Sequence, residues 1–378
     1  MSSAVAEGHK SKVKSQKPRI FDFRLWTLHF LRPRIACGVY HTSYAEDMAL
    51  RTTPSSRLRL TVIVLAAVLF PFVASDYAVG EANRLGIAII GAIGLNILVG
   101  FTGQISIAQG AFMAIGGYTT AIMTVTLGLP FWLSLPTAGL MTALIGAAFG
   151  TPSLRLKGLY LLIATLAAQV IVEWLILHMV WLTKGSSGIY GIKPPALGPL
   201  VFADRREFYF LTLAFVGLSV LFAANLFRTR IGRAFVAIRD HDIAASVIGV
   251  DLFRYKLLAF AVSSFYVGIA GALQAHDRLI VSPEYFNIGV SIEYLGMIII
   301  GGLGTINGAI FGAAFIRLLP AALSILTAAI GLPNMNVGVL QQAVFGLAIV
   351  GFLVLEPHGL AKIWRDVKDY FRLWPFSY

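Results

Sequence analysis

Charged residues are missing from a long central stretch of this chain. Between Leu85 and Leu154 the sequence contains no Asp, Glu, Lys, Arg or His. Only 13% of all 378 residues are charged, against roughly 25% in soluble domains, while 57% are hydrophobic. This deficit excludes a soluble globular protein and predicts an integral membrane protein.

Cysteine and the usual catalytic patterns are also scarce. The single cysteine, Cys37, excludes an intramolecular disulfide and, alone, any cysteine-based metal cluster. No Gly-Lys dipeptide occurs, so the chain has no P-loop for a nucleotide. The seven His lie mostly in tails and loops, which leaves no credible catalytic triad. We therefore predict no catalytic residue, no metal and no cofactor, and energy for pumping has to come from a partner or an ion gradient.

The net charge of +12 is concentrated outside the apolar segments. Basic residues in tails and short loops set the orientation of a membrane protein, so this charge does not indicate nucleic-acid binding. No cleavable signal peptide is visible, because the first long apolar run begins near Leu58. We predict a basic, disordered N-terminal tail over 1–57, within which Met48 could begin the working protein. A transmembrane domain follows over 58–356, and a C-terminal tail over 357–378.

Apolar runs long enough to cross a bilayer recur along the chain. They predict an all-α polytopic membrane protein with about ten transmembrane helices, including broken or half-spanning segments. The eighth run ends in several glycines and is short enough to be a half-helix. The ten runs are 58–76, 85–101, 108–127, 131–150, 158–181, 208–227, 256–275, 291–303, 306–330 and 338–355.

The most informative stretch is 94–120, in which a Gly-rich polar middle from Gly100 to Gly110 separates two apolar runs. Backbone at membrane depth leaves the helix only where protein or a water-filled path covers it. The stretch therefore indicates either a helix break beside a solute path or a short polar turn between two helices. The residues that would line such a path are Asn96, Gly103, Gln104, Ser106, Gln109 and Gly110.

Small residues also recur at a spacing of four in the ninth run. Gly304, Gly308 and Gly312 would share one helix face and let a neighbouring helix approach closely. A faint internal echo relates the sequence from Gln109 to Phe112 to that from Asn307 to Ile310. Each copy follows a Gly-containing polar break, as in transporters with internal repeats.

Few ionisable groups fall inside the apolar runs. They are Glu173, His178, Glu293 and Arg317. Such groups are costly in lipid and usually face protein or water. A pair between Glu173 and Arg317 is conceivable, whereas for Glu293, near the end of a run, we expect a wet interface.

The longest basic loop, 228–256, contains an amphipathic pattern. Ile231, Ala234, Phe235 and Ile238 recur at helical spacing, with arginines on the other positions. A lone basic loop can simply mark the cytoplasmic side, but the small residues Ala244, Ala245 and Gly249 indicate a helical hairpin against which another protein packs.

Three stretches together, 94–121, 228–264 and 291–315, resemble the membrane permease subunits of ABC importers for branched-chain amino acids, the LivM-like family. The likeness extends over most of 60–356. It implies an inner-membrane permease, with both termini cytoplasmic, that forms half of a translocation path. It implies as partners a second homologous permease, two cytoplasmic ABC ATPases and a periplasmic solute-binding protein, together with membrane lipid.

The resemblance also assigns the loop 228–256 to ATPase docking. The docking candidates are Arg233, Arg239, Asp242, Ala244, Ala245 and Gly249. In the family a glutamate often precedes the two alanines, and here Ile243 occupies that place. Three other functions stay open: the same machine importing urea, short amides or aromatic acids, an ion-coupled secondary transporter, and a membrane scaffold or receptor.

Overall fold

A computed structural model describes most of the chain beyond its N-terminal tail. Residues 1–53, including Cys37 and Met48, lie outside the described residues, so the prediction for that part of the tail stays a prediction. Residues 54–57, predicted as the end of the tail, are helical. The chain divides into two compact units, and the first, Met1–Ala66, is described only in the opening part of one helix. The described residues are 54–153, 156, 158–197, 200–329, 337–356 and 358–373.

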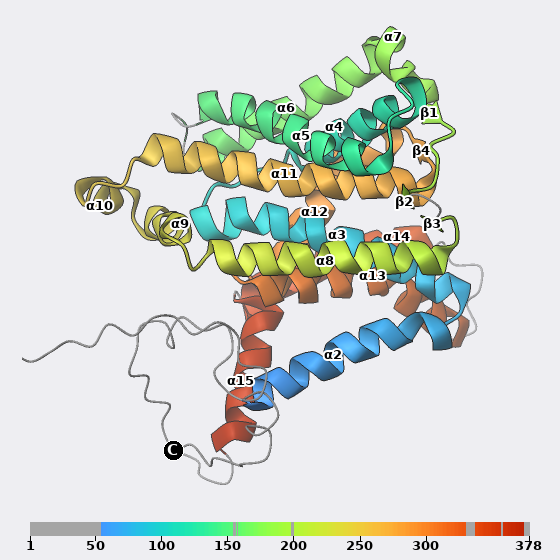
Figure 1. Ribbon diagram of the computed structural model, residues 1–378. Coiled ribbons are helices and arrows are strands. Elements are labelled where there is room, and N and C mark those ends of the chain that lie inside the picture. The colour runs from blue at the N-terminus through green and yellow to red at the C-terminus, as the bar shows by residue number, and fades with distance from the viewer. Residues whose placement is uncertain are drawn as a thin grey trace, which may run out of the picture. The chain divides into compact units, whose positions relative to one another are not determined.

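Helices make up almost all of the described structure (Figure 1). In chain order they are α2 Pro54–Val73, α3 Asp76–Thr102, α4 Gln109–Ala121 with a π-helical turn Ile122–Thr126, α5 Phe131–Ser153, α6 Leu159–His178, α7 Val180–Thr183, α8 Arg205–Leu226, α9 Arg230–Asp240, α10 Asp242–Val247, α11 Leu252–Arg278, α12 Ile288–Gly301, α13 Ile306–Ala329, α14 Val337–Leu355 and α15 Gly359–Leu373. Two short 3₁₀ turns cover Gly185–Ser187 and Pro283–Phe286, and four two-residue strands are β1 Ile189–Tyr190, β2 Ala196–Leu197, β3 Leu200–Val201 and β4 Ile280–Val281.

Each of the ten predicted apolar runs coincides with a helix, but fewer of them meet the requirements of a full span. Six helices in the described ranges are long and apolar enough to cross a membrane, or seven if α14 and α15 are taken as one bent span. α12 is one of the exceptions, because 14 residues extend only about 21 Å against the roughly 30 Å of a hydrocarbon core. The segment predicted as a C-terminal tail contains α15.

α3 is the most buried of these long helices, and it packs against α8, α11, α12 and α13 (Figure 1). α11 in turn packs against α4 and α5. Glycines make these contacts close: a Cβ at Gly116 of α4 would overlap the backbone of Gly268 in α11, and one at Gly271 would overlap the carbonyl of Met113. Small residues of this kind allow helices to pack in lipid, where water does not drive them together.

Two shorter helices, α4 and α12, begin half-way along the bundle. α3 ends at Thr102, and the six residues after it return along the helix, so that the Gln109 amide donates to the carbonyl of Gly91. α12 begins beside this point, where the Ser291 hydroxyl accepts from the backbone N–H of Gly110 at 2.8 Å. The N-terminal ends of α4 and α12 therefore meet at mid-depth, and the two helices run in opposite directions from there.

This arrangement changes the interpretation of the internal echo. The sequence similarity compares the start of α4 with the start of α13, whereas the structure brings together the starts of α4 and α12. α4 follows α3, and α12 follows α11, each after a full-length helix and a return segment without α-helix. The structural counterparts are therefore the pairs α3–α4 and α11–α12.

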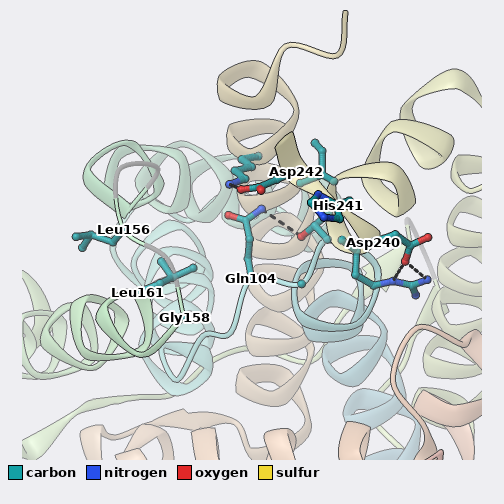
Figure 2. A pocket seen from close by; sticks show the side chains of 12 residues that line it. Gln104, Leu156, Gly158, Leu161, Asp240, His241 and Asp242 are labelled. Carbon is teal, nitrogen blue, oxygen red and sulfur yellow. Dashed lines mark hydrogen bonds and ion pairs between the residues drawn. The ribbon is translucent and has the colours of Figure 1, made fainter. Parts of the chain in front are cut away.

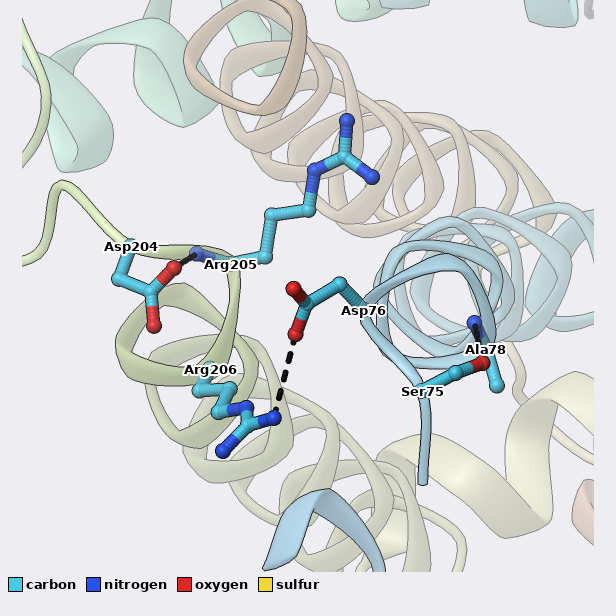
Figure 3. A network of polar contacts seen from close by, with 6 residues as sticks. All are labelled: Ser75, Asp76, Ala78, Asp204, Arg205 and Arg206. Atoms are coloured by element: carbon cyan, nitrogen blue, oxygen red, sulfur yellow. Dashed lines mark hydrogen bonds and ion pairs between the residues drawn. The ribbon is translucent and has the colours of Figure 1, made fainter.

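Polar side chains lie at the N-terminal ends of α3 and α8 and hold these two ends together (Figure 3). Ser75 caps α3 by accepting from Ala78 N at 3.4 Å, and Asp204 caps α8 by accepting from Arg205 N at 2.9 Å. Between the two helices Arg206 donates to Asp76 at 3.2 Å, with both side chains well exposed. An exposed pair of this kind stabilises a protein by about 1 kcal/mol at most.

Short strands order the connection between α6 and α8. β1 pairs with β4 in antiparallel register, Ile189 opposite Val281, and β2 pairs with β3. β4 follows directly after α11, so this connection is tied to the segment that leads back to the start of α12.

Candidate functional site

The break predicted in 100–110 is present and extends over residues 103–108. Gly103 closes α3 in the left-handed region, with φ of +69°, a conformation that glycine adopts without strain. Two of the predicted path residues in the break are buried and hydrogen-bonded within the chain, while Gly103 is exposed: the Gln104 amide donates to Thr102, and the Ser106 hydroxyl accepts from Ala108 N. In the conformation described, these side chains form hydrogen bonds with other groups in or beside the break.

At the start of α4, backbone N–H groups without a partner in the helix donate to three side chains that the sequence did not indicate. Thr165 of α6 accepts from Ile107 N at 3.0 Å, and Gln169 of α6 accepts from Ala111 N at 2.6 Å. Ser291 of α12 accepts from Gly110 N. Unpaired backbone groups in a bilayer cost several kcal/mol each, so these contacts make the break possible. A glutamine near the middle of the largely apolar α6 is the sequence signal that could have identified Gln169.

Asn96 joins this break to a second one. Its Oδ1 accepts from Gly304 N at 3.0 Å, and its Nδ2 donates to the carbonyl of Thr305 at 2.8 Å. Gly304 and Thr305 lie in the non-helical segment between α12 and α13. Asn96 therefore binds the backbone of the second break from the middle of α3's C-terminal half.

The three glycines predicted to share a helix face have different positions. Gly308 and Gly312 lie on α13 against α12, where a Cβ at Gly312 would overlap the carbonyl of Met297. Gly304 precedes the helix and has φ of +72°, so it belongs to the break and not to the packing face. α13 begins only at Ile306.

Arg239 links α9 to both breaks. Its Nη1 donates to the carbonyl of Gly100 at 3.3 Å, near the C-terminal end of α3, and its Nε and Nη2 contact Asp240. A Cβ added to Gly304 would come within 2.7 Å of the same guanidinium. A cation at a helix C-terminus is favourably placed against the helix dipole.

A cavity of about 310 Å³ lies where the first break meets the loop 228–256. Gln104 from the break and His241 and Asp242 from the loop point into it (Figure 2). The predicted path residues and the predicted docking residues, which are far apart in sequence, therefore meet at one polar cavity. Its lining comprises Thr102, Gly103, Gln104, Leu156, Gly158, Leu161, Ile238, Arg239, Asp240, His241, Asp242 and Lys256.

The loop 228–256 is a helical hairpin, α9 followed by α10. The amphipathic prediction for α9 agrees with the structure, since Ala234, Phe235 and Ile238 are buried. The three small residues on α10 and just after it have different environments: Ala245 is buried within the chain, while Ala244 and Gly249 are exposed. Around them Ile243, Val247 and Ile248 are exposed by 63%, 81% and 75%. The outward surface of α10 is thus apolar.

The polar docking candidates already have contacts within the chain. Asp242 of α10 lies 3.8 Å from the Lys256 ammonium, and Arg233 donates to the carbonyl of Arg228 at 3.5 Å. Arg239 is held by Gly100 and Asp240 as described above. Outward contacts of this hairpin therefore depend mainly on its apolar side chains.

Comparison with known proteins identifies relatives over most of the chain. Residues 77–353 match the family model described as branched-chain amino acid transport system / permease component. The high-affinity branched-chain amino acid transport system permease protein LivM of Salmonella typhimurium is 35% identical over 323 residues, 79% of this chain and 75% of that protein. LivM of Escherichia coli is 37% identical over 277 residues, 67% of this chain and 65% of that protein.

One of the more distant relatives has a different name. The autoinducer 2 import system permease protein LsrC of Salmonella typhi is 26% identical over 273 residues, 67% of this chain and 72% of that protein. No solved structure matches the chain.

Proposed function

The chain belongs to the family of permease components of branched-chain amino acid transport systems, and on that premise we propose that it forms half of the translocation path of an ABC importer for branched-chain or related aliphatic amino acids. It is a multi-pass membrane protein and a transport component, not an enzyme. The observation that supports a path in this chain is the pair of half-helices α4 and α12, whose N-terminal ends meet at mid-depth and are held there by Gln169 and Ser291. Broken helices of this kind form solute sites in transporters.

The partners follow from the family. Membership implies ABC-transporter partners, among them two ABC ATPases, which the exposed apolar side chains of Ile243, Val247 and Ile248 would contact. A second homologous permease would complete the path, and a periplasmic binding protein would deliver the solute. Because α9 reaches both breaks through Arg239, a movement of the hairpin driven by ATP would be transmitted to Gly100 and Gly304.

Uptake by the reconstituted complex tests this proposal. We expect ATP-dependent accumulation of leucine, isoleucine and valine, in the presence of the binding protein, and little accumulation of urea, acetamide or phenylacetate. Accumulation of one of those three solutes alone would assign a different cargo to the same machine. Uptake without any ATPase would favour an ion-coupled secondary transporter.

We further propose that both termini and the α9–α10 hairpin face the cytoplasm of a bacterial inner membrane, because basic residues gather there. In a variant with Cys37 replaced by serine, Ser187→Cys should react with a membrane-impermeant maleimide in intact spheroplasts. Ser246→Cys, also exposed, should react only after permeabilisation. The reverse pattern would overturn the orientation.

A further inference from the structure

An ion pair lies in the middle of the transmembrane domain and has no part in holding the breaks. Arg317 of α13 contacts Glu293 of α12, with Nη1 and Oε1 3.4 Å apart. Arg317 is the twelfth residue of the 20-residue candidate span Ile306–Ile325, so it lies near the centre of the bilayer. The partner of Arg317 is Glu293, not Glu173, which corrects the pairing considered from the sequence.

The ion pair is partly exposed at the surface of the chain. The Arg317 and Glu293 side chains are exposed by 28% and 27% in the isolated chain. A charge facing lipid at mid-depth is costly, so polar groups there face protein or a water-filled cavity. The guanidinium is directed sideways to Glu293, which keeps it from reaching along α13 to the membrane surface. The exposed side of the pair therefore faces a partner subunit or the solute path.

Unsatisfied polar atoms surround the pair, and they point to a ligand. Arg317 Nε and the Tyr294 hydroxyl are both buried without a hydrogen bond of good geometry, although the hydroxyl lies close to the guanidinium. Tyr294 itself is 1% exposed, and its ring packs on Gly91, whose carbonyl accepts from Gln109 at the start of α4. The pair is thus connected to the mid-depth junction of the half-helices.

A carboxylate beside a guanidinium with spare donors matches the head group of an amino acid. Building on the proposed function, we propose that Glu293 and Arg317 bind the zwitterionic α-ammonium and α-carboxylate groups of the solute as it passes through the permease. Glu293 accepts from the ammonium, Arg317 donates to the carboxylate, and Tyr294 donates to the same carboxylate. Charge-assisted hydrogen bonds of this kind are about twice as strong as neutral ones.

The weak internal pairing suits a transient site. A single contact of 3.4 Å is long for a bidentate Arg–carboxylate pair and is readily exchanged for contacts with a solute.

Uptake measurements separate recognition of a solute from a purely structural ion pair. We expect Glu293→Gln and Arg317→Gln each to lower leucine uptake, measured per assembled complex, by about tenfold or more. The control Arg206→Gln, which breaks the exposed pair with Asp76, should change uptake less than about twofold. The exchange variant Glu293→Arg/Arg317→Glu restores a structural pair but reverses the solute's orientation, so we expect it to remain defective. Normal uptake by this variant, or by the doubly neutral Glu293→Gln/Arg317→Gln, would overturn the proposal.

Thiol labelling tests the water-lined path independently of the solute. With Cys37 replaced by serine, Glu293→Cys in the assembled complex should react with a charged methanethiosulfonate reagent in at least one nucleotide state. Leu144→Cys, exposed in the isolated chain and near the middle of α5, should not react, because it faces lipid or a subunit. Absence of reaction at position 293 in every nucleotide state would overturn the proposal. If the wild-type complex imports no amino acid at all, the proposed function fails, whereas the labelling still reports on the path.

Discussion

Replacing Gly110 by alanine is expected to lower uptake by at least about tenfold, because a single methyl group overlaps the junction of the half-helices. A Cβ at this position would come 2.6 Å from the carbonyl oxygen of Phe286 and 2.9 Å from that of Asn287. Both atoms are backbone and cannot move aside as a flexible side chain would. Overpacking in a well-packed core costs roughly 1–3 kcal/mol, and here it would also lengthen the bond from Gly110 N to Ser291.

The effect is measured as leucine uptake per assembled complex, together with the thermal stability of the purified complex. Gly217→Leu is the matched control: Gly217 also lies within a helix, α8, but nothing lies within 4 Å of a Cβ added there. We expect the larger substitution to have the smaller effect. Wild-type uptake by Gly110→Ala would show that α4 and α12 do not meet as closely as described.

The position of the first break could be predicted from the sequence because its signals are local. Glycines and polar residues interrupt an uncharged apolar run, and the break lies within the interval from Gly100 to Gly110. The partners of the break could not be predicted in the same way. Gln169 and Ser291 lie 58 and 181 residues from their partners Ala111 and Gly110. A glutamine in an apolar helix marks Gln169 as unusual, but the sequence does not indicate which backbone group either side chain contacts.

The partner of the ionisable Arg317 could not be predicted from the sequence either. Sequence position places Arg317 deep in a span, but two acids, Glu173 and Glu293, were available as partners. The choice depends on α12 beginning at mid-depth, which brings Glu293 to the level of Arg317. The sequence predicts a wet interface for Glu293 because Glu293 lies near the end of an apolar run. That prediction holds only if the run crosses the whole membrane, and α12 does not.

In the α9–α10 hairpin, too, the sequence predicts some features and not others. Helical periodicity identified the buried face of α9, because that face packs on the rest of the domain throughout its length. On α10 the spacing of small residues did not show which of them face inward. Ala245 packs inside, and the residues exposed beside it are large and apolar. The family's docking assignment, applied here as a proposal, therefore rests on Ile243, Val247 and Ile248 more than on the alanines.

Ile248→Glu is expected to release the ATPase from the purified complex and to abolish ATP-dependent uptake. Ile248 is 75% exposed beside Val247, and exposed clusters of large apolar side chains on membrane-protein loops are typical of protein interfaces. A buried carboxylate without a partner costs several kcal/mol, enough to lower affinity by a hundredfold or more, on the order of 10²–10³. Gly249→Glu is a less direct test, because Gly249 has φ of +91° and any side chain there strains the turn.

The measurement is co-purification of the ATPase with the permease, followed by uptake in proteoliposomes. Ile248→Leu preserves apolar volume at the same exposed position, so this variant should still bind the ATPase and support uptake. Arg233→Ala removes an exposed charge from α9 and should weaken coupling only modestly, since exposed ion pairs contribute about 1 kcal/mol at most. If Ile248→Glu keeps both the ATPase and uptake, the apolar surface of α10 is not the docking element. A loss of uptake with the ATPase still bound would instead place the defect in the transmission from the hairpin, through Arg239, to the two breaks.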